Sequence, residues 1–383
     1  MKTALILEGG GCKGAFEAGI IKYISEKQIK IDLVGGTSVG GLNAACFAFN
    51  KCDDLISLWE NIDNSQVYVP SGFVKLVQSL ETSINPKKLS SIKDLVHQLL
   101  YCLHGPWWTH IPSWVSLVGI ASKLFKQLQL PPSATETINA IVKNVLEKNC
   151  LLDNTPLQQV CERLFGTSNV ADAPTPLYIT AFELQGARLT YFGHDSDEGD
   201  LNVPLVDALM ATSAIQLAFP TKLIGNKQYI DGGNGSNLPL KYAIRHQCDR
   251  IILARDNMVD KPVTDMFRKV WDVVLRAYLA SFTNVTIQDE KWAGEISKRI
   301  LREQENIKML QQFTSQILEP QLKQSYENKL KSYRPIFDNK YPIEIIEVVP
   351  DWTPSNIVDF NADTSRKLIQ NGYEKASNLL ANI

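Results

Sequence analysis

Two stretches near the start of the chain share one pattern: Thr3–Gly14 is TALILEGGGCKG, and Leu33–Gly40 is LVGGTSVG. In each, a short apolar run ends in glycines, and a segment with helical spacing follows. After the first stretch, the apolar residues at positions 16, 20, 21 and 24 fit one face of a helix that spans residues 15–27. Strand, glycine turn and helix in alternation predict a parallel sheet that is covered by helices.

The rest of the chain continues this alternation with longer interruptions. Further strands are expected at 177–181, 190–192, 251–254 and 343–349. A closing helix is expected at about 364–380, a helical and apolar insert at 65–150, and a helical segment with repeated opposite charges at 265–335. We therefore expect a single domain over 1–383 with the insert and the charged segment added to a core that comprises 1–64, 165–260 and 340–383.

The composition is that of an ordinary globular protein. Hydrophobic residues make up 44% and charged residues 21% of the 383 residues, which excludes a disordered, collagen-like or coiled-coil chain. The 39 Lys and Arg residues against 41 Asp and Glu residues leave a net charge of −2. A chain so close to neutrality has no general attraction for nucleic acid, and no nucleic-acid partner is expected.

The cysteines and the first residues bear on the compartment. The number of cysteines, seven, is odd, and no two of them stand in a CxxC motif. Neither a disulfide framework nor a zinc site is therefore expected. The apolar run near the N-terminus is four residues long and is followed by Glu8, which is too short for a signal peptide. We expect a cytoplasmic protein with reduced thiols, no metal and no signal peptide.

The first glycine motif, GGGCKG at 9–14, has more than one interpretation. It contains the GxGxxG spacing of a dinucleotide-binding loop, and Asp32 follows at about the distance of a ribose-binding acid. That acid should end the second strand, whereas Asp32 stands before Leu33–Val34. A P-loop does not fit, because Gly14 is not followed by Lys and then Ser or Thr. A nucleotide-binding or catalytically silent interaction protein remains an alternative.

The second motif is GTSVG at 36–40, in which Ser38 stands between an expected strand and a helical run at 41–50. This is the context of a nucleophile elbow, in which small residues let the chain turn sharply and hold the serine hydroxyl clear of the backbone. Ser38 is therefore a candidate nucleophile. The alternative is a glycine-rich packing turn in which Ser38 caps the helix.

The two motifs explain each other if the reaction is acyl transfer. Attack on an ester carbonyl creates an oxyanion, and backbone N–H groups of a glycine-rich loop at a helix N-terminus are suited to stabilise it. Lys13 adds a cation to this loop that could hold the loop or meet a phosphate, although an ordinary surface lysine fits equally well.

A serine hydroxyl needs a neighbouring base to become nucleophilic. Of the five histidines, only His246 follows the core strands, in the α/β-hydrolase order Ser38, Asp231, His246, but its surroundings indicate an exposed helix end. The other candidate is Asp231, which follows the apolar pair Tyr229–Ile230 and precedes two glycines. Functional side chains collect at such loop positions, while a simple Asp-Gly turn is the alternative.

Together these residues resemble the patatin-like phospholipases. The glycine loop GGGCKG, the elbow GTSVG, the stretch DALMATSAIQLAFP at Asp207–Pro220 and the DGG at Asp231 appear in that family's order within residues 1–260. The motif glycines are Gly9, Gly14, Gly36, Gly40, Gly232 and Gly233.

The resemblance implies a doubly wound α/β fold, with a mostly parallel sheet and helices on both faces. It implies Ser38 as the nucleophile and Asp231 as the general base, without a histidine. Backbone amides at Gly10, Gly11 and Cys12 would form the oxyanion hole. Phospholipids or other acyl lipids would be the substrates, without a metal or cofactor, and some members need a protein or small-molecule activator. The expected function is that of a lipid acyl hydrolase of the phospholipase A type, and an acyltransferase on the same scaffold is an alternative.

One segment inside the insert is unusual. No Asp, Glu, Lys or Arg occurs from Leu95 to Ser122, a stretch that includes Trp107, Trp108 and Trp114. Prolines and glycines interrupt it, so it does not fit a membrane-spanning helix. One interpretation is a lid on the membrane surface with its tryptophans at the headgroup boundary, which predicts peripheral membrane association. A buried core helix is the other interpretation.

Overall fold

The computed structural model describes residues 1–70, 150, 152–194, 203–216, 218–255, 270–333, 342–354 and 356–383. Most of the expected insert falls outside these residues, including the uncharged stretch with Trp107, Trp108 and Trp114. The membrane-lid interpretation of that stretch therefore stays a prediction.

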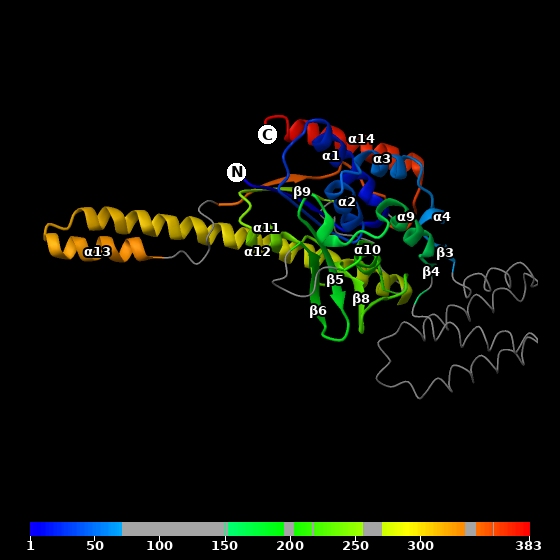
Figure 1. Cartoon of the computed structure of the whole chain (residues 1–383), viewed down its shortest axis with the longest axis horizontal. Coiled ribbons are helices and arrows are strands. Elements are labelled where there is room, and N and C mark those ends of the chain that lie inside the picture. The colour runs from blue at the N-terminus through cyan, green and yellow to red at the C-terminus, as the bar shows by residue number, and fades with distance from the viewer. Residues whose placement is uncertain are drawn as a thin grey trace, which may run out of the picture.

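An eight-stranded sheet forms the centre of the molecule (Figure 1). Its order is β10-β9-β1-β2-β5-β8-β7, and β6 pairs with β5 beside this path. The strands are β1 (Thr3–Leu7), β2 (Leu33–Thr37), β5 (Leu177–Glu183), β6 (Arg188–Gly193), β7 (Lys222–Ile224), β8 (Lys227–Asp231), β9 (Arg250–Ala254) and β10 (Glu344–Val348). The strands from β10 to β5 are parallel, whereas β6, β7 and β8 form antiparallel pairs. This confirms the mostly parallel sheet. A separate short pair, β3 (Val69–Pro70) and β4 (Leu152–Asp153), flanks the insert.

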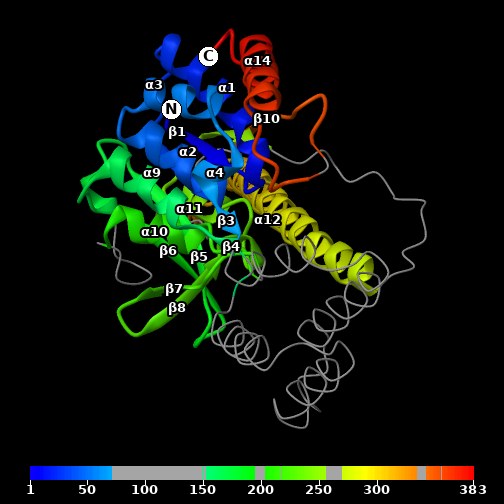
Figure 2. The same ribbon diagram turned by 90° about the vertical axis from the view of Figure 1, so that its right-hand side faces the viewer.

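Helices cover both faces of the sheet, which confirms the doubly wound arrangement (Figures 1 and 2). The α-helices among the described residues are α1 (Ala15–Glu26), α2 (Val39–Ala48), α3 (Cys52–Glu60), α4 (Asn64–Val67), α9 (Thr155–Phe165), α10 (Leu205–Thr212), α11 (Leu240–Arg245), α12 (Val270–Ser315), α13 (Pro320–Ser332) and α14 (Ala362–Leu379). Short 3-10 helices are η1 (Gly11–Gly14), η3 (Val170–Asp172) and η4 (Gly232–Asn234).

The alternation of side chains in β1 defines the two layers. Leu5 and Leu7 pack with residues of α1, α2, α10 and α14, whereas Ala4 and Ile6 pack with residues of α11 and α12 on the other face. Successive side chains of a strand point to opposite faces, so one strand supplies both cores. All residues of β1 are buried, as expected for a strand with helices on both sides.

Helix α12 is 46 residues long and belongs to two regions of the molecule. Its side chains Ala293, Ile296 and Ile300 are buried in the core beneath the sheet. Farther along, the helix leaves the sheet and pairs with α13 in a hairpin that projects from the body (Figure 1). Helix α12 ends at Ser315 and α13 begins at Pro320. Proline is tolerated in the first turn of a helix but not in its interior, so one continuous helix is excluded. The charged segment is thus helical over most of 270–333.

Helices α1 and α14 cross with their backbones in contact. A Cβ atom added at Gly19 would lie 2.0 Å from the carbonyl oxygen of Ile369, and one added at Gly372 would lie 2.0 Å from that of Phe16. Neither position has room for a side chain. Glycine at both positions therefore lets α14 approach closely enough to bury its apolar residues, such as Leu368, in the core that contains Leu5 and Leu7 of β1.

We expect Gly372→Ala to lower the free energy of unfolding by about 1–3 kcal/mol, because the added methyl group forces α14 away from α1. The matched control is Gly294→Ala in α12, where nothing lies within 4 Å of the added Cβ atom. There the better helix propensity of alanine should raise the free energy of unfolding by up to about 1 kcal/mol. Urea unfolding followed by circular dichroism compares both variants with the parent. Equal stability of the two variants would contradict the close crossing.

Candidate active site

Ser38 lies in a strained turn between β2 and α2. Its φ of 55° and ψ of −127° form a combination that residues with side chains rarely adopt. The turn is so tight that a Cβ atom at Gly36 would lie 2.2 Å from the carbonyl oxygen of Gly40. The N–H of Ser38 donates to the Thr212 hydroxyl at 2.7 Å. This is the local structure that a nucleophile elbow requires, with the serine at the N-terminus of a helix.

Strand register brings Asp231 to the same edge of the sheet. Thr37, which directly precedes Ser38, pairs with Thr180 of β5. The next residue of β5, Ala181, pairs with Asp231 at the end of the antiparallel strand β8. Two sequence-predicted residues that are far apart in the chain therefore face each other across one strand of the sheet.

The Asp231 side chain is buried, with 1% of its residue surface exposed. Burial raises the pKa of its carboxyl group to about 6, because the charged form loses its hydration. The Gly233 N–H, 2.8 Å from Oδ1, and the Ser38 hydroxyl both oppose this shift. Oδ2 makes no hydrogen bond of normal geometry, although the Ser38 hydroxyl is near enough to lower the pKa of the carboxyl group. Asp231 is therefore mostly ionised at neutral pH, with one oxygen available as a proton acceptor beside Ser38.

The glycine loop leaves the end of β1 and passes close to Ser38. A Cβ atom at Gly9 would lie 3.0 Å from that of Ser38 and 2.6 Å from the side-chain oxygen of Asn237. Glycine is required here, since the loop has to pass between two side chains.

The loop residues expected to form an oxyanion hole differ in their contacts. The Cys12 N–H donates to the carbonyl oxygen of Ile357 at 2.8 Å, and the Cys12 thiol lies 3.2 Å from that of Asn356. Because the Cys12 N–H already has a partner, Gly10 and Gly11 are the remaining candidates for binding an oxyanion. Gly11 has a φ of 61° and lines the cavity beside Ser38.

The remaining motif residues pack around these groups. Lys13 is half-buried, and its N–H lies 3.3 Å from the carbonyl oxygen of Gly10. Gly14 packs against the Val39 side chain, and Gly232 against the backbone of Thr180. Gly14 and Gly232 thus allow the loop and the Asp231 turn to approach the elbow.

Threonines tie the elbow to the Asp231 turn, and the sequence motifs did not reveal them. The Thr37 hydroxyl forms a short hydrogen bond with that of Thr180 and lies 3.0 Å from the carbonyl oxygen of Ser236. The Thr180 hydroxyl is 3.1 Å from the carbonyl oxygen of Gly36. Threonines are common in strands, so these residues carry no signal until the strand register is known.

The His246 side chain contacts two tyrosines. Its Nε2 atom lies 2.9 Å from the Tyr178 hydroxyl, and its ring stacks on Tyr242 with 5.8 Å between ring centroids. It belongs to an aromatic cluster at the end of α11. The contact between Ser38 and Asp231 does not involve it.

An apolar cavity opens beside Ser38. Its volume is about 50 Å³, which leaves room for roughly three or four water molecules. Its walls come from α2, α3, α9 and neighbouring loops, and include Leu42, Trp59, Leu157, Val160, Phe219 and Phe360. Figure 2 shows α2, α4 and α9 clustered in this part of the molecule.

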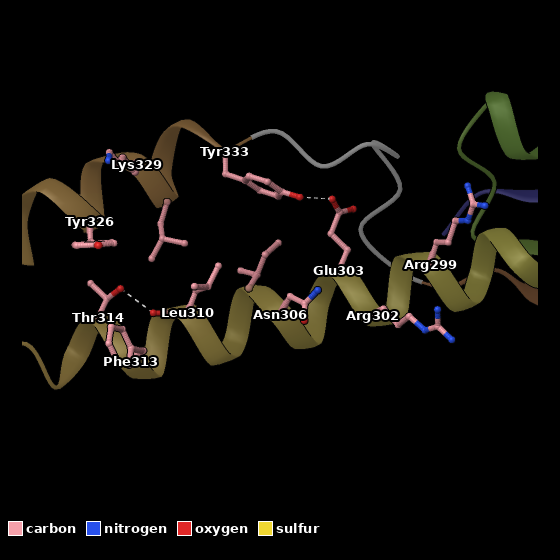
Figure 3. Close-up of a pocket in the computed structure, with 12 residues that line it drawn as sticks. Arg299, Arg302, Glu303, Asn306, Leu310, Phe313, Thr314, Tyr326, Lys329 and Tyr333 are labelled. Atoms are coloured by element: carbon pink, nitrogen blue, oxygen red, sulfur yellow. Dashed lines mark hydrogen bonds between the residues drawn. The ribbon is translucent and has the colours of Figure 1, made fainter.

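A larger groove, of about 830 Å³, lies between α12 and α13 (Figure 3). Arg299 and Arg302 lie at one end of it, and Phe313 and Tyr326 at the other. None of its lining residues belongs to the glycine loop, the elbow or the Asp231 turn. The larger groove therefore lies away from the candidate catalytic residues.

Two features are absent from the described part of the chain. No group of three or more His, Cys, Asp or Glu side chains there forms a candidate metal site. No helix in the same part is both long and apolar enough to cross a bilayer.

Comparison with known proteins extends these observations. The family model described as Patatin-like phospholipase matches residues 5–244. The lysophospholipase nte1 of Aspergillus terreus is 48% identical over 46 residues, which are 12% of this chain and 3% of that protein. The uncharacterized protein L620 of Acanthamoeba polyphaga mimivirus is 20% identical over 276 residues, and the match covers 63% of each chain. The chain therefore spans less than two thirds of the length of these relatives.

Two solved structures are also similar to this chain. VipD from Legionella pneumophila matches with a TM-score of 0.41 and 14% identity, over 99% of this chain and 66% of VipD. The ExoU–SpcU complex from Pseudomonas aeruginosa matches with a TM-score of 0.25 and 19% identity, over 56% of this chain and 36% of the matched one. The family model spans the glycine loop, the elbow and the Asp231 turn in one continuous match, and the chain belongs to the patatin-like phospholipase family.

Proposed function

We propose that this chain is a lipid acyl hydrolase of the phospholipase A type, with Ser38 as nucleophile and Asp231 as general base. One observation carries the proposal: a serine in a strained elbow faces a buried carboxylate whose pKa is raised to about 6. A serine hydroxyl becomes nucleophilic when a neighbouring base takes its proton. A base with a pKa near the working pH does this efficiently.

In the first half of the reaction, Asp231 accepts the proton of Ser38 while the serine oxygen attacks the carbonyl carbon of the ester. The charge that develops on the carbonyl oxygen is stabilised by the N–H groups of Gly10 and Gly11. When the tetrahedral intermediate collapses, the lysophospholipid leaves with the proton from Asp231. In the second half, water gives a proton to Asp231 and attacks the acyl-enzyme, and the fatty acid leaves as Ser38 regains its proton.

The apolar cavity beside Ser38 supports a lipid substrate, since its walls match an acyl chain. At about 50 Å³ it holds only a few water molecules, so its side chains have to move apart to admit such a chain. An activating protein or small molecule could supply that change. We further propose that the protein is cytoplasmic and binds the surface of a membrane through the stretch that contains Trp107, Trp108 and Trp114.

Removal of either dyad residue tests the proposed chemistry. Ser38→Ala and Asp231→Asn should each lower fatty-acid release from phosphatidylcholine vesicles by at least about a thousandfold, because the nucleophile or its base is lost. Ser38→Ala should also abolish labelling by a fluorophosphonate. The control is His246→Ala, which changes a residue of the aromatic cluster and should retain activity. Substantial release by either dyad variant would exclude this dyad.

Acid should inactivate the enzyme through Asp231. Its pKa is about 6, and only the ionised carboxylate can accept the proton of Ser38. We expect kcat/KM for a soluble p-nitrophenyl ester to be level at neutral pH, to fall to about half near pH 6, and to approach a tenfold fall for each further pH unit in acid. The initial-rate profile from neutral to acid pH measures this. A profile that stays level well below pH 6 would show that Asp231 is not the base.

The same shift predicts a gain in stability on neutralising the carboxyl group. The pKa of Asp231 rises from 3.8 to about 6 on folding, so the native state binds more protons than the unfolded chain between these values. The charged form then destabilises the native state at neutral pH by up to about 3 kcal/mol. Asp231→Asn should raise the free energy of unfolding at neutral pH by part of this amount, and the gain should vanish near pH 4. Urea unfolding at both pH values checks this sign; a gain that persists in acid would contradict it.

A further inference from the structure

A buried segment after the Asp231 turn, Ser236–Leu238, contacts the glycine loop, the elbow and α12. Its central residue, Asn237, is 1% exposed. The amide nitrogen Nδ2 of Asn237 lies 3.2 Å from the carbonyl oxygen of Gly9 and 3.1 Å from Oε1 of Glu8. Both partners are acceptors, so they determine which way the amide points. The Asn237 side chain thus holds Gly9, the first residue of the glycine loop, by its carbonyl oxygen.

Gly9 lies between Asn237 and Ser38. The position of a Cβ atom on Gly9 is 2.6 Å from Oδ1 of Asn237 and 3.0 Å from Cβ of Ser38. Gly10 and Gly11, whose N–H groups face the reaction in the proposed mechanism, follow Gly9 directly. The place at which Asn237 holds Gly9 therefore sets the distance of these donors from the Ser38 oxygen.

Helix α12 in turn holds Asn237 and its neighbours. The Thr286 hydroxyl donates to Oε1 of Glu8 at 3.1 Å and lies 3.3 Å from Nδ2 of Asn237. Three residues farther along the same helix, Oδ2 of Asp289 accepts from the Ser236 hydroxyl at 3.0 Å and from the Leu238 N–H at 3.1 Å. One face of α12 thus fixes the segment on both sides of Asn237.

We propose that Asn237 is a positioning residue that sets the oxyanion-binding N–H groups of the glycine loop relative to Ser38, held in place by Thr286 and Asp289. This inference rests on the proposed acyl hydrolysis. An amide suits the position because Glu8, Gly9 and Thr286 all present acceptor oxygens to Nδ2, which has two protons to donate. An ionised aspartate of the same shape has no proton to donate and would place a second carboxylate against Glu8.

The first test is Asn237→Asp, measured at about pH 8, where Asp231 is ionised. We expect kcat for a soluble ester to fall by about a hundredfold or more, as on loss of an oxyanion donor, with KM changed by less than about threefold. A trifluoromethyl ketone, whose adduct with Ser38 bears an oxyanion, should bind more weakly by a similar factor. An ether analogue that cannot be attacked should bind as it does to the parent.

Two further variants separate positioning from folding. The double variant Glu8→Gln with Asn237→Asp exchanges donor and acceptor, so it restores the bond between positions 8 and 237 but not the bond to Gly9. Its melting temperature should recover while its kcat stays low. Thr286→Val should lower kcat by roughly threefold to tenfold at constant KM, because Asn237 keeps its bond to Gly9. Asn154→Asp changes another buried asparagine, 4% exposed, outside the site, and should leave kcat unchanged.

The outcomes distinguish this inference from the proposed function. If the parent neither hydrolyses the ester nor reacts with a fluorophosphonate, the proposed function itself fails. If the parent is active, three results would each overturn the positioning role: kcat of Asn237→Asp within about threefold of the parent, equal weakening of both inhibitors, or recovery of kcat in the double variant.

Discussion

The burial of one carboxyl group, that of Asp231, is the constraint on which the arrangement of this site depends. Burial penalises the charged form, and the groups that oppose the penalty are a backbone N–H and a hydroxyl, both neutral. Glu183, on the neighbouring strand β5, shows the other solution. Burial acts against its charge too, but hydrogen bonds from Arg188 and Lys227 hold the pKa of that carboxyl below its ordinary value. Neutral partners leave Asp231 basic, whereas cations make Glu183 a structural anion.

The antiparallel strands explain how this carboxyl group reaches Ser38. Ser38 and the glycine loop follow the ends of β2 and β1, which run side by side in the same direction. Strand β8 runs antiparallel to β5, so it approaches from the C-terminal end of β5. Its last residue, Asp231, lies opposite Ala181, the residue after Thr180. The chain then turns beneath the elbow through Ser236–Leu238 and enters α11 on the opposite face. The departure from a parallel sheet therefore lies where the proposed chemistry needs it.

Local patterns in the sequence predicted much of this arrangement. The apolar runs of β1, β2 and β9, the helix after each glycine motif and the closing helix α14 all occur at the expected positions. Ser38 and Asp231 are candidates in the sequence because each stands at a strand end beside glycines. Helix α9 lies just beyond the end assigned to the insert, and the three residues of β7 are too few to show an alternation.

Contacts that depend on distant parts of the chain were not predictable in this way. Thr37 and Thr180 meet only through the register of β2 and β5. Asn237 follows a glycine-rich turn and, in the sequence alone, is like any other loop asparagine. The groove of the α12–α13 hairpin is a further feature that the motifs did not predict. It is larger than the cavity beside Ser38, but none of the sequence motifs lines it.

The contact between Cys12 and Ile357 has a consequence for how the protein is made. Ile357 lies just before α14 in the chain. The Cys12 N–H can therefore donate to the Ile357 carbonyl oxygen only after residue 357 has been synthesised. Ser38 and Asp231 leave the ribosome well before Ile357 does. In a nascent chain, Ser38 and Asp231 are therefore synthesised before the contact between Cys12 and Ile357 can form, and the glycine loop gains this contact only once the segment before α14 packs against it.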